Sequence, residues 1–88
     1  MIIKLLRTAV FGDPLPDNGL AEEAVESYIR STEYDTGDDF WIAKGDLHNF
    51  CVWRELDTDP LTVYVNAYAV ELDTDNTEHV AYYVFDVR

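Results

Sequence analysis

The amino-acid sequence predicts a two-layer α+β fold, in which one helix packs on a mainly antiparallel sheet of about five strands. Three observations lead to this class. Residues 61–87 hold two long segments rich in Val, Tyr and Phe around a polar connector. A helical period follows a turn-rich break, and two short strand-like segments flank a Gly-Asp turn at residues 45–46. The expected order is strand, helix and four strands, in a single domain of residues 1–88.

The first strand is expected over residues 2–11, where apolar residues dominate. Gly, Pro, Asp and Asn make up most of residues 12–19 and predict a break in regular structure. A helix should follow, with Asp17 or Asn18 as its N-cap. Its apolar residues share one half of the helical wheel and form the face that packs: Leu20, Ala21, Ala24, Val25, Tyr28 and Ile29.

Residues 31–39 form a polar connector, and short strands are expected at residues 40–44 and 47–56, before a turn at 57–60. In the long hairpin of residues 61–87, alternation places Val63, Val65, Ala67 and Ala69 on one face of the first arm and Tyr64, Asn66, Tyr68 and Val70 on the other. In the second arm it places Val80, Tyr82 and Val84 opposite Ala81, Tyr83, Phe85 and Val87.

One helix of roughly thirteen residues is about 20 Å long and covers only one face of such a sheet. The second face either curls on itself or meets another subunit or a partner. Large aromatic side chains are the candidate anchors for that contact, and the alternative is that they fill the core beneath the helix. These residues are Trp41, Trp53, Tyr64, Tyr68 and Tyr82.

Charge is the strongest signal in the composition, with six basic and eighteen acidic residues and a net charge of −12. Binding to nucleic acid or to an anionic membrane is disfavoured, because like-charge repulsion replaces the counterion release that drives such contacts. The charge favours a basic protein surface as partner, such as that of a nucleic-acid-binding protein. Cys51 is the single cysteine, so no internal disulfide is expected, and a cytoplasmic location is the simpler prediction.

The expected chain directions gather carboxylates at two poles of the sheet, because the helix end, the start of the second strand and the turn at residues 57–60 meet at the same pole. That acidic pole is the predicted partner-binding surface: Glu33, Asp35, Asp38, Asp39, Glu55, Asp57, Asp59 and Asp86. The opposite pole receives Asp13, Asp17 and Asp46 together with a secondary acidic cluster at the hairpin tip, Asp73, Asp75 and Glu78.

The sequence offers no pattern that names a reaction. The hairpin-tip cluster lacks the glycine and the twelfth-position acid of a calcium loop. His48, Cys51 and His79 do not have zinc-ligand spacing, and His48 and Cys51 should point to opposite faces of their strand. We therefore expect a protein without catalytic residues, bound metal or cofactor.

The leading hypothesis is a small acidic inhibitor of phage or viral type that occupies the basic nucleic-acid-binding surface of its target. Anti-CRISPR proteins, anti-restriction proteins and inhibitors of DNA-repair enzymes are examples of such DNA-mimic-like function. The alternative is an ordinary intracellular α+β module of a halophilic organism or virus, whose acidity is salt adaptation. Its low lysine content and excess of Asp over Glu favour that alternative. A homodimer that uses the open sheet face is compatible with either hypothesis.

Overall fold

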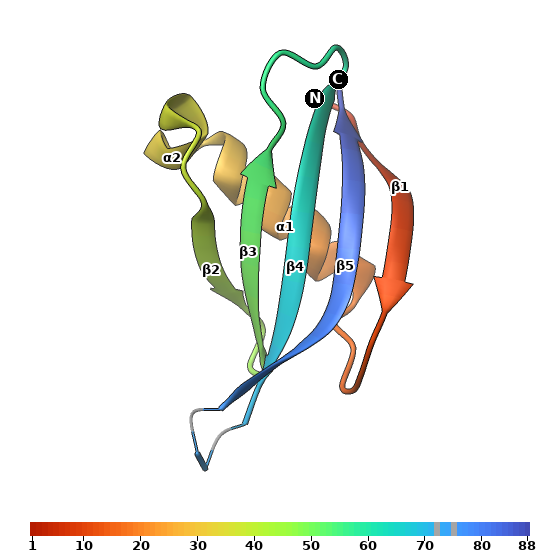
Figure 1. The fold of residues 1–88 in the computed structure, drawn as a ribbon, viewed down its shortest axis with the longest axis vertical. Coiled ribbons are helices and arrows are strands. Elements are labelled where there is room, and N and C mark those ends of the chain that lie inside the picture. Colours follow the sequence, from red (N-terminus) through yellow and green to blue (C-terminus); the bar gives the residue numbers. More distant parts are fainter. Residues whose placement is uncertain (72, 75) are drawn as a thin grey trace.

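The computed structural model describes residues 1–71, 73–74 and 76–88, and these confirm the α+β class. Their elements are β1 (Ile3–Val10), α1 (Asn18–Ile29), α2 (Thr32–Thr36), β2 (Phe40–Lys44), β3 (His48–Arg54), β4 (Leu61–Val70) and β5 (Thr77–Val87). In this part of the chain the strands form one five-stranded sheet in the order β1-β5-β4-β3-β2 (Figure 1), and every neighbouring pair is antiparallel.

Helix α1 begins where its capping residue predicts. The Asp17 carboxylate accepts a hydrogen bond from the Gly19 amide at 2.8 Å, which satisfies one of the free N–H groups of the first turn. The buried side of the helix is made by Ala21, Ala24, Val25 and Tyr28, all within the predicted apolar face. This side packs against β2, β3 and β4, so α1 covers one face of the sheet (Figure 1).

The element order differs from the prediction at one place, because the polar connector contains a second helix, α2. Ser31 caps it by accepting a hydrogen bond from the Tyr34 amide, and Gly37 ends it with a φ of 79°, a left-handed conformation that favours glycine. The helix is five residues long. A segment so short has no repeating apolar face, which explains why periodicity did not predict it.

The long hairpin is present as β4 and β5, with two corrections to the predicted layout. Strand β5 begins at Thr77, so Glu78 lies opposite Ala69 in the ladder instead of in the connector. The pairing also shifts between Ala67 and Tyr68, and the extra residue on β5 is Val80. Because a bulge reverses the alternation locally, Val80 joins the core on the helix side and does not share the face of Tyr82 as predicted.

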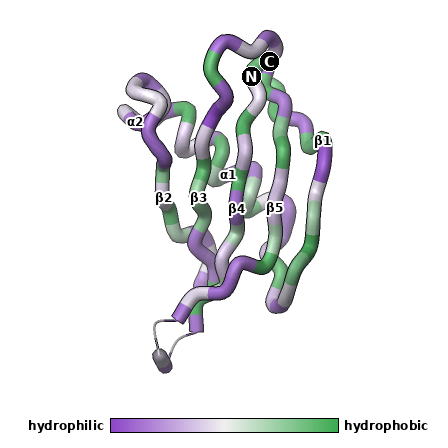
Figure 2. Tube along the Cα trace, in the orientation of Figure 1, coloured by the Kyte–Doolittle hydropathy of each residue, from purple (hydrophilic) through white to green (hydrophobic). Residues whose placement is uncertain are grey.

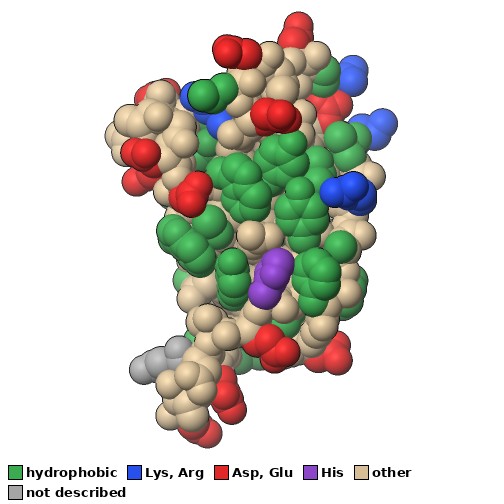
Figure 3. Space-filling view, viewed as in Figure 1, with side chains coloured by type: hydrophobic (Ala, Val, Ile, Leu, Met, Phe, Trp, Pro, Cys, Tyr) green, Lys and Arg blue, Asp and Glu red, His purple; other side chains and the backbone are tan. Residues whose placement is uncertain are grey.

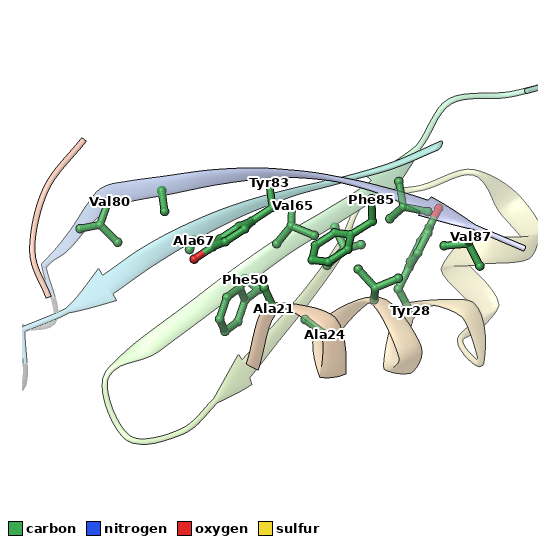
Figure 4. Packing of buried hydrophobic residues seen from close by; sticks show 14 of the residues in the cluster. Ala21, Ala24, Tyr28, Phe50, Val65, Ala67, Val80, Tyr83, Phe85 and Val87 are labelled. Carbon is green, nitrogen blue, oxygen red and sulfur yellow. The ribbon is translucent and has the colours of Figure 1, made fainter. Parts of the chain in front are cut away.

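The core lies between α1 and the sheet, and Figure 4 shows its side chains meeting between the two layers. Its largest fully buried members are Tyr28, Phe50 and Tyr83, surrounded by valines of β3, β4 and β5. Hydrophilic stretches gather toward the ends of the strands, including the base of the β4–β5 hairpin (Figure 2). Among the described residues, no helix combines the length and apolar character needed to cross a membrane.

Candidate functional site: an open aromatic face between two acidic ends

The face of the sheet that α1 does not cover is occupied mainly by aromatic side chains. Along β4 the core residues alternate with Tyr64, Asn66 and Tyr68, which point away from the helix. Figure 3 views this open face and shows hydrophobic side chains spread across its centre, with acidic side chains above and below them. We call it the open face.

One aromatic row crosses the open face near its upper half. The Trp53 and Tyr64 rings are stacked with centroids 5.6 Å apart, and Tyr64 and Tyr82 are stacked at 6.3 Å. The guanidinium carbon of Arg7 lies 5.8 Å from the centroid of the Tyr82 ring, a cation–π distance. The row therefore runs from β3 to the edge strand β1 and ends in a positive charge.

A second row lies closer to the hairpin. Trp41 and Tyr68 have ring centroids 5.5 Å apart, Tyr68 and His79 are 5.1 Å apart, and His79 and Phe11 are 4.9 Å apart. Trp41 is 60% exposed and Phe11 is 59% exposed, so both present most of their surface to solvent. Sequence reasoning missed Phe11, His79 and Arg7 as members of this face. Strand parity groups Arg7 with Phe11, but it would have placed His79 on the face opposite Tyr82, because the bulge at Val80 reverses the alternation in β5.

The predicted aromatic anchors Trp41, Tyr64, Tyr68 and Tyr82 all belong to the open face, as does Trp53. The alternative that they fill the core beneath the helix is wrong. A different aromatic set fills that core, consisting of Tyr28, Phe50, Tyr83 and Phe85.

Two polar groups of the open face have shifted acidity. The Tyr64 hydroxyl donates a 2.8 Å hydrogen bond to the Glu55 carboxylate, and this bond, followed by partial burial, raises the pKa of Tyr64. Cys51 is buried beside Asn66, and burial together with the nearby Asp39 carboxylate raises the pKa of its thiol to about 11. Both groups are neutral at physiological pH.

Carboxylates gather at the upper end of the sheet, as the chain directions predict, since the C-terminal end of α1, helix α2 and the β3–β4 loop meet there (Figure 1). We call this set the upper acidic end: Glu33, Asp35, Asp38, Asp39, Glu55, Asp57 and Asp59. Asp86, also predicted for this pole, is only 6% exposed and bonds to Arg88 at 3.1 Å, so it is not part of the exposed set.

Basic residues share the upper acidic end, which sequence reasoning did not take into account. Arg30 follows α1, Arg54 ends β3, Arg88 follows β5 and Lys4 is the second residue of β1. Arg54 is held in place because its Nε donates to the Tyr34 carbonyl at 2.9 Å and its guanidinium lies over the Tyr34 ring. These residues reduce the net negative charge of this end.

The opposite end carries more net negative charge. We call it the lower acidic end, and its described carboxylates are Asp13, Asp17, Glu22, Glu23, Asp46, Glu71, Asp73 and Glu78. Lys44 is the basic residue at this end within the described residues. Asp75, predicted for the hairpin-tip cluster, lies outside the described residues. The structure adds Glu71, because it stands at the base of the hairpin beside Asp13, lining a cavity of about 560 Å³ with apolar walls from Leu47 and Val70.

His48, Cys51 and His79 do not converge. His48 is on the helix side, where Nε2 lies 2.8 Å from the Pro14 carbonyl, whereas Cys51 and His79 are on the open face. The predicted opposition of His48 and Cys51 is confirmed. Within the described residues, no three His, Cys, Asp or Glu side chains form a group that could hold a metal ion.

Comparisons of the chain with family models, curated proteins and solved structures found no match.

Proposed function

We propose that this chain is a non-catalytic acidic inhibitor, of phage or viral type, that acts in the cytoplasm by occupying the basic nucleic-acid-binding surface of another protein. The observation that supports it is the exposure of unpaired carboxylates at both ends of the sheet. Across the described residues, the Arg88–Asp86 contact is the single ion pair within 4.0 Å. Carboxylates without an internal ion pair are available to pair with Lys and Arg of a target.

Charge density decides which part of the surface can imitate a nucleic acid. A net charge of −12 over an accessible surface of 5316 Å² averages one charge per about 440 Å². Duplex DNA carries roughly one charge per 100 Å², from one phosphate per about 1.7 Å of axis on a cylinder of about 10 Å radius. The average charge is therefore several-fold too dilute, and clustering is needed to approach the density of DNA, so the contact is assigned to an acidic end.

The balance of charges favours the lower acidic end over the upper one. Both ends collect exposed carboxylates, but four basic residues accompany the upper set, whereas Lys44 accompanies the lower one among the described residues. Electrostatic steering depends on the summed field and not on the number of acids alone. The preference for the lower acidic end differs from the prediction based on chain directions, which made the upper set the main partner-binding surface and the hairpin tip the secondary one.

The test is competition with DNA. A basic nucleic-acid-binding protein is mixed with labelled duplex DNA, and this chain should displace the DNA less effectively as salt rises from about 0.1 M to about 1 M, because screening weakens exposed charge pairs. Charge reversal of Asp13, Asp46 and Asp73 to Lys should abolish displacement. The matched control is the reversal of Glu33, Asp35 and Asp38 at the upper end, which should have the smaller effect.

Failure of both triple variants to change displacement would assign the contact elsewhere and contradict the proposal. The halophile alternative has a different signature. An acidic module adapted to molar salt should be unfolded at about 0.1 M salt and fold only near 1 M, because its carboxylates repel each other when unscreened. Far-UV circular dichroism across this salt range separates the two functions.

A further inference from the structure

The open face is self-complementary, and we propose that it binds a second copy of this chain about a two-fold axis that runs parallel to the central strand β4. This inference does not rest on the proposed function, because it uses the sheet face and leaves the lower acidic end exposed, although it engages Asp39 of the upper acidic end. The proposed dimer geometry follows from the pairing register of the five strands. A two-fold axis along the middle strand of a five-stranded face places β1 over β2 of the second copy, β5 over β3, and β4 over β4.

Residues that are level with one another in the strand register form three rows across the open face, and these register rows differ in membership from the two aromatic rows. The first register row pairs charges. Arg7 lies opposite Val84, which lies opposite Tyr64 and then Trp53. Asp39 precedes Phe40, whose partner is Val52, so Asp39 is level with Trp53 at the other edge of the same row. In the dimer Arg7 therefore meets Asp39 of the second copy, at two symmetry-related places.

The same row also pairs a hollow with a large side chain. A depression of about 420 Å³ on the open face is lined by Leu6, Arg7, Tyr64 and Val84. The two-fold axis brings Trp53 of the second copy over Val84, the floor of that depression. Such insertion of an indole into a preformed hollow is typical of the residues that dominate interface energetics.

The second row has large and small residues at complementary positions about its centre. Its order is Ala9, Tyr82, Asn66, Cys51 and Trp41. The axis places Trp41 of one copy over Ala9 of the other, and Tyr82 over Cys51. Asn66 faces its own copy at the axis, where two side-chain amides can donate and accept reciprocally. Every large ring in this row meets a small side chain.

The third row repeats the pattern at its edge but places two large rings together at the axis. It contains Phe11, His79, Tyr68, Asn49 and Ala43. The axis places Phe11 of one copy over Ala43 of the other and His79 over Asn49, with Tyr68 facing Tyr68. A horizontal axis, running across the strands, would instead place β1 over β1 of the second copy and would lose the pairing of Arg7 with Asp39. Packing of twisted sheets rotates the strands by about 30°, so the match is tightest near β4.

The size and chemistry of the open face also fit a second copy better than a basic protein. Five strands about 4.8 Å apart and about eight residues long span roughly 600 Å² of flat area, close to the ~800 Å² of accessible surface per partner in a stable interface. The exposed carboxylates stand at the ends and the centre is aromatic. An apolar centre is what homodimer interfaces share.

Sedimentation equilibrium of the full chain tests the inference. The wild type should dimerise, and more tightly at about 1 M than at about 0.1 M salt. Salt screens the repulsion between two chains that each carry a net charge of −12, which outweighs its weakening of the two Arg7–Asp39 pairs, and it does not weaken apolar contacts. This salt dependence is opposite to the one expected for DNA competition. A monomer at both salt concentrations would overturn the inference and leave the open face to a different partner.

Charge-swap variants test the axis. Arg7→Asp and Asp39→Arg should each weaken the dimer about tenfold or more, since each places like charges opposite one another twice, and the double variant should restore it. Asp39→Arg separates two explanations. The variant makes the chain less negative, so a dimer limited only by overall charge repulsion should become tighter, whereas a dimer that depends on the Arg7–Asp39 pair should become weaker. Ala9→Trp should also weaken the dimer, by colliding with Trp41 of the second copy.

Circular dichroism and urea unfolding of each variant report whether the monomer still folds. A dimer that tolerates all three single variants uses another surface, which would refute the proposed face. A dimer weakened by both swaps but not restored by their combination would refute the two-fold axis.

Discussion

Phe50 and Trp41 show how the same kind of side chain has opposite roles on the two faces of the sheet. Phe50 is fully buried against α1, whereas Trp41 is 60% exposed on the open face. Phe50→Ala should lower the free energy of unfolding by about 3–5 kcal/mol, because it removes apolar contacts and leaves a cavity. Trp41→Ala should cost less than about 1 kcal/mol when unfolding is measured in urea with dilute, monomeric protein. Equal losses would contradict the assignment of faces.

Burial of the Cys51 thiol makes the free energy of unfolding depend on pH. The thiol has a pKa of about 11 in the folded chain, against an ordinary value of 9.0. Between these pH values the unfolded chain loses the proton while the folded chain keeps it, so stability is present at lower pH and lost as pH rises, by up to about 1.4 kcal/mol per pH unit.

Cys51→Ala should therefore flatten the decline of the free energy of unfolding between about pH 9 and pH 11, measured by urea titration at each pH. Tyr28 and Tyr83, whose pKa values are also raised by burial, contribute the decline that remains in the variant. A slope identical to that of the wild type would show that the thiol is not protected in the folded chain.

At the scale of elements, α1 depends on its N-cap. Asp17→Ala removes the acceptor of the 2.8 Å hydrogen bond from Gly19 and should cost about 1 kcal/mol of stability. Asp13→Ala removes the same charge at the same end of the sheet but no capping bond, so it is the matched control. Urea unfolding of the two variants should differ by most of that amount, and a larger loss in Asp13→Ala would contradict the capping role.

Several elements could be predicted because their signals are local. β2 has the predicted bounds, and the alternation of Val65 with Tyr64 correctly divides β4 into two faces. Helix α2 and the bulge that turns Val80 toward the core were not predictable. A single helical turn has no period, and a bulge is decided by how two strands distant in sequence share their hydrogen bonds.

For the whole molecule, the prediction concerns salt. Exposed carboxylates at the two acidic ends repel one another, so the free energy of unfolding at pH 7 should rise with salt, by on the order of 1 kcal/mol between about 0.1 M and 1 M sodium chloride. Urea unfolding of dilute protein at matched salt concentrations measures it. A fall in stability with salt would mean that attractive charge pairs outweigh the repulsion.

The candidate site shows the same division between sequence and structure. Chain order alone placed Asp35, Asp38 and Asp57 at one end of the sheet, because antiparallel connections leave few choices of direction. It did not show that Arg54 and Arg88 stand at that end too, nor that Asp86 is buried. Burial and charge balance depend on every element that meets at a point, and no local pattern carries that information.

Composition, alternation and capping residues were enough for the fold class, the acidic character and the hairpin at its centre, because propensity and period act over a few neighbouring residues. Only the tertiary structure decided which large aromatic residues stand on the uncovered face and which fill the core, and that Arg7 and Asp39 occupy opposite edges of one row. Such cross-strand neighbours are brought together by the register of distant segments, which is set by the packing of the whole sheet against α1.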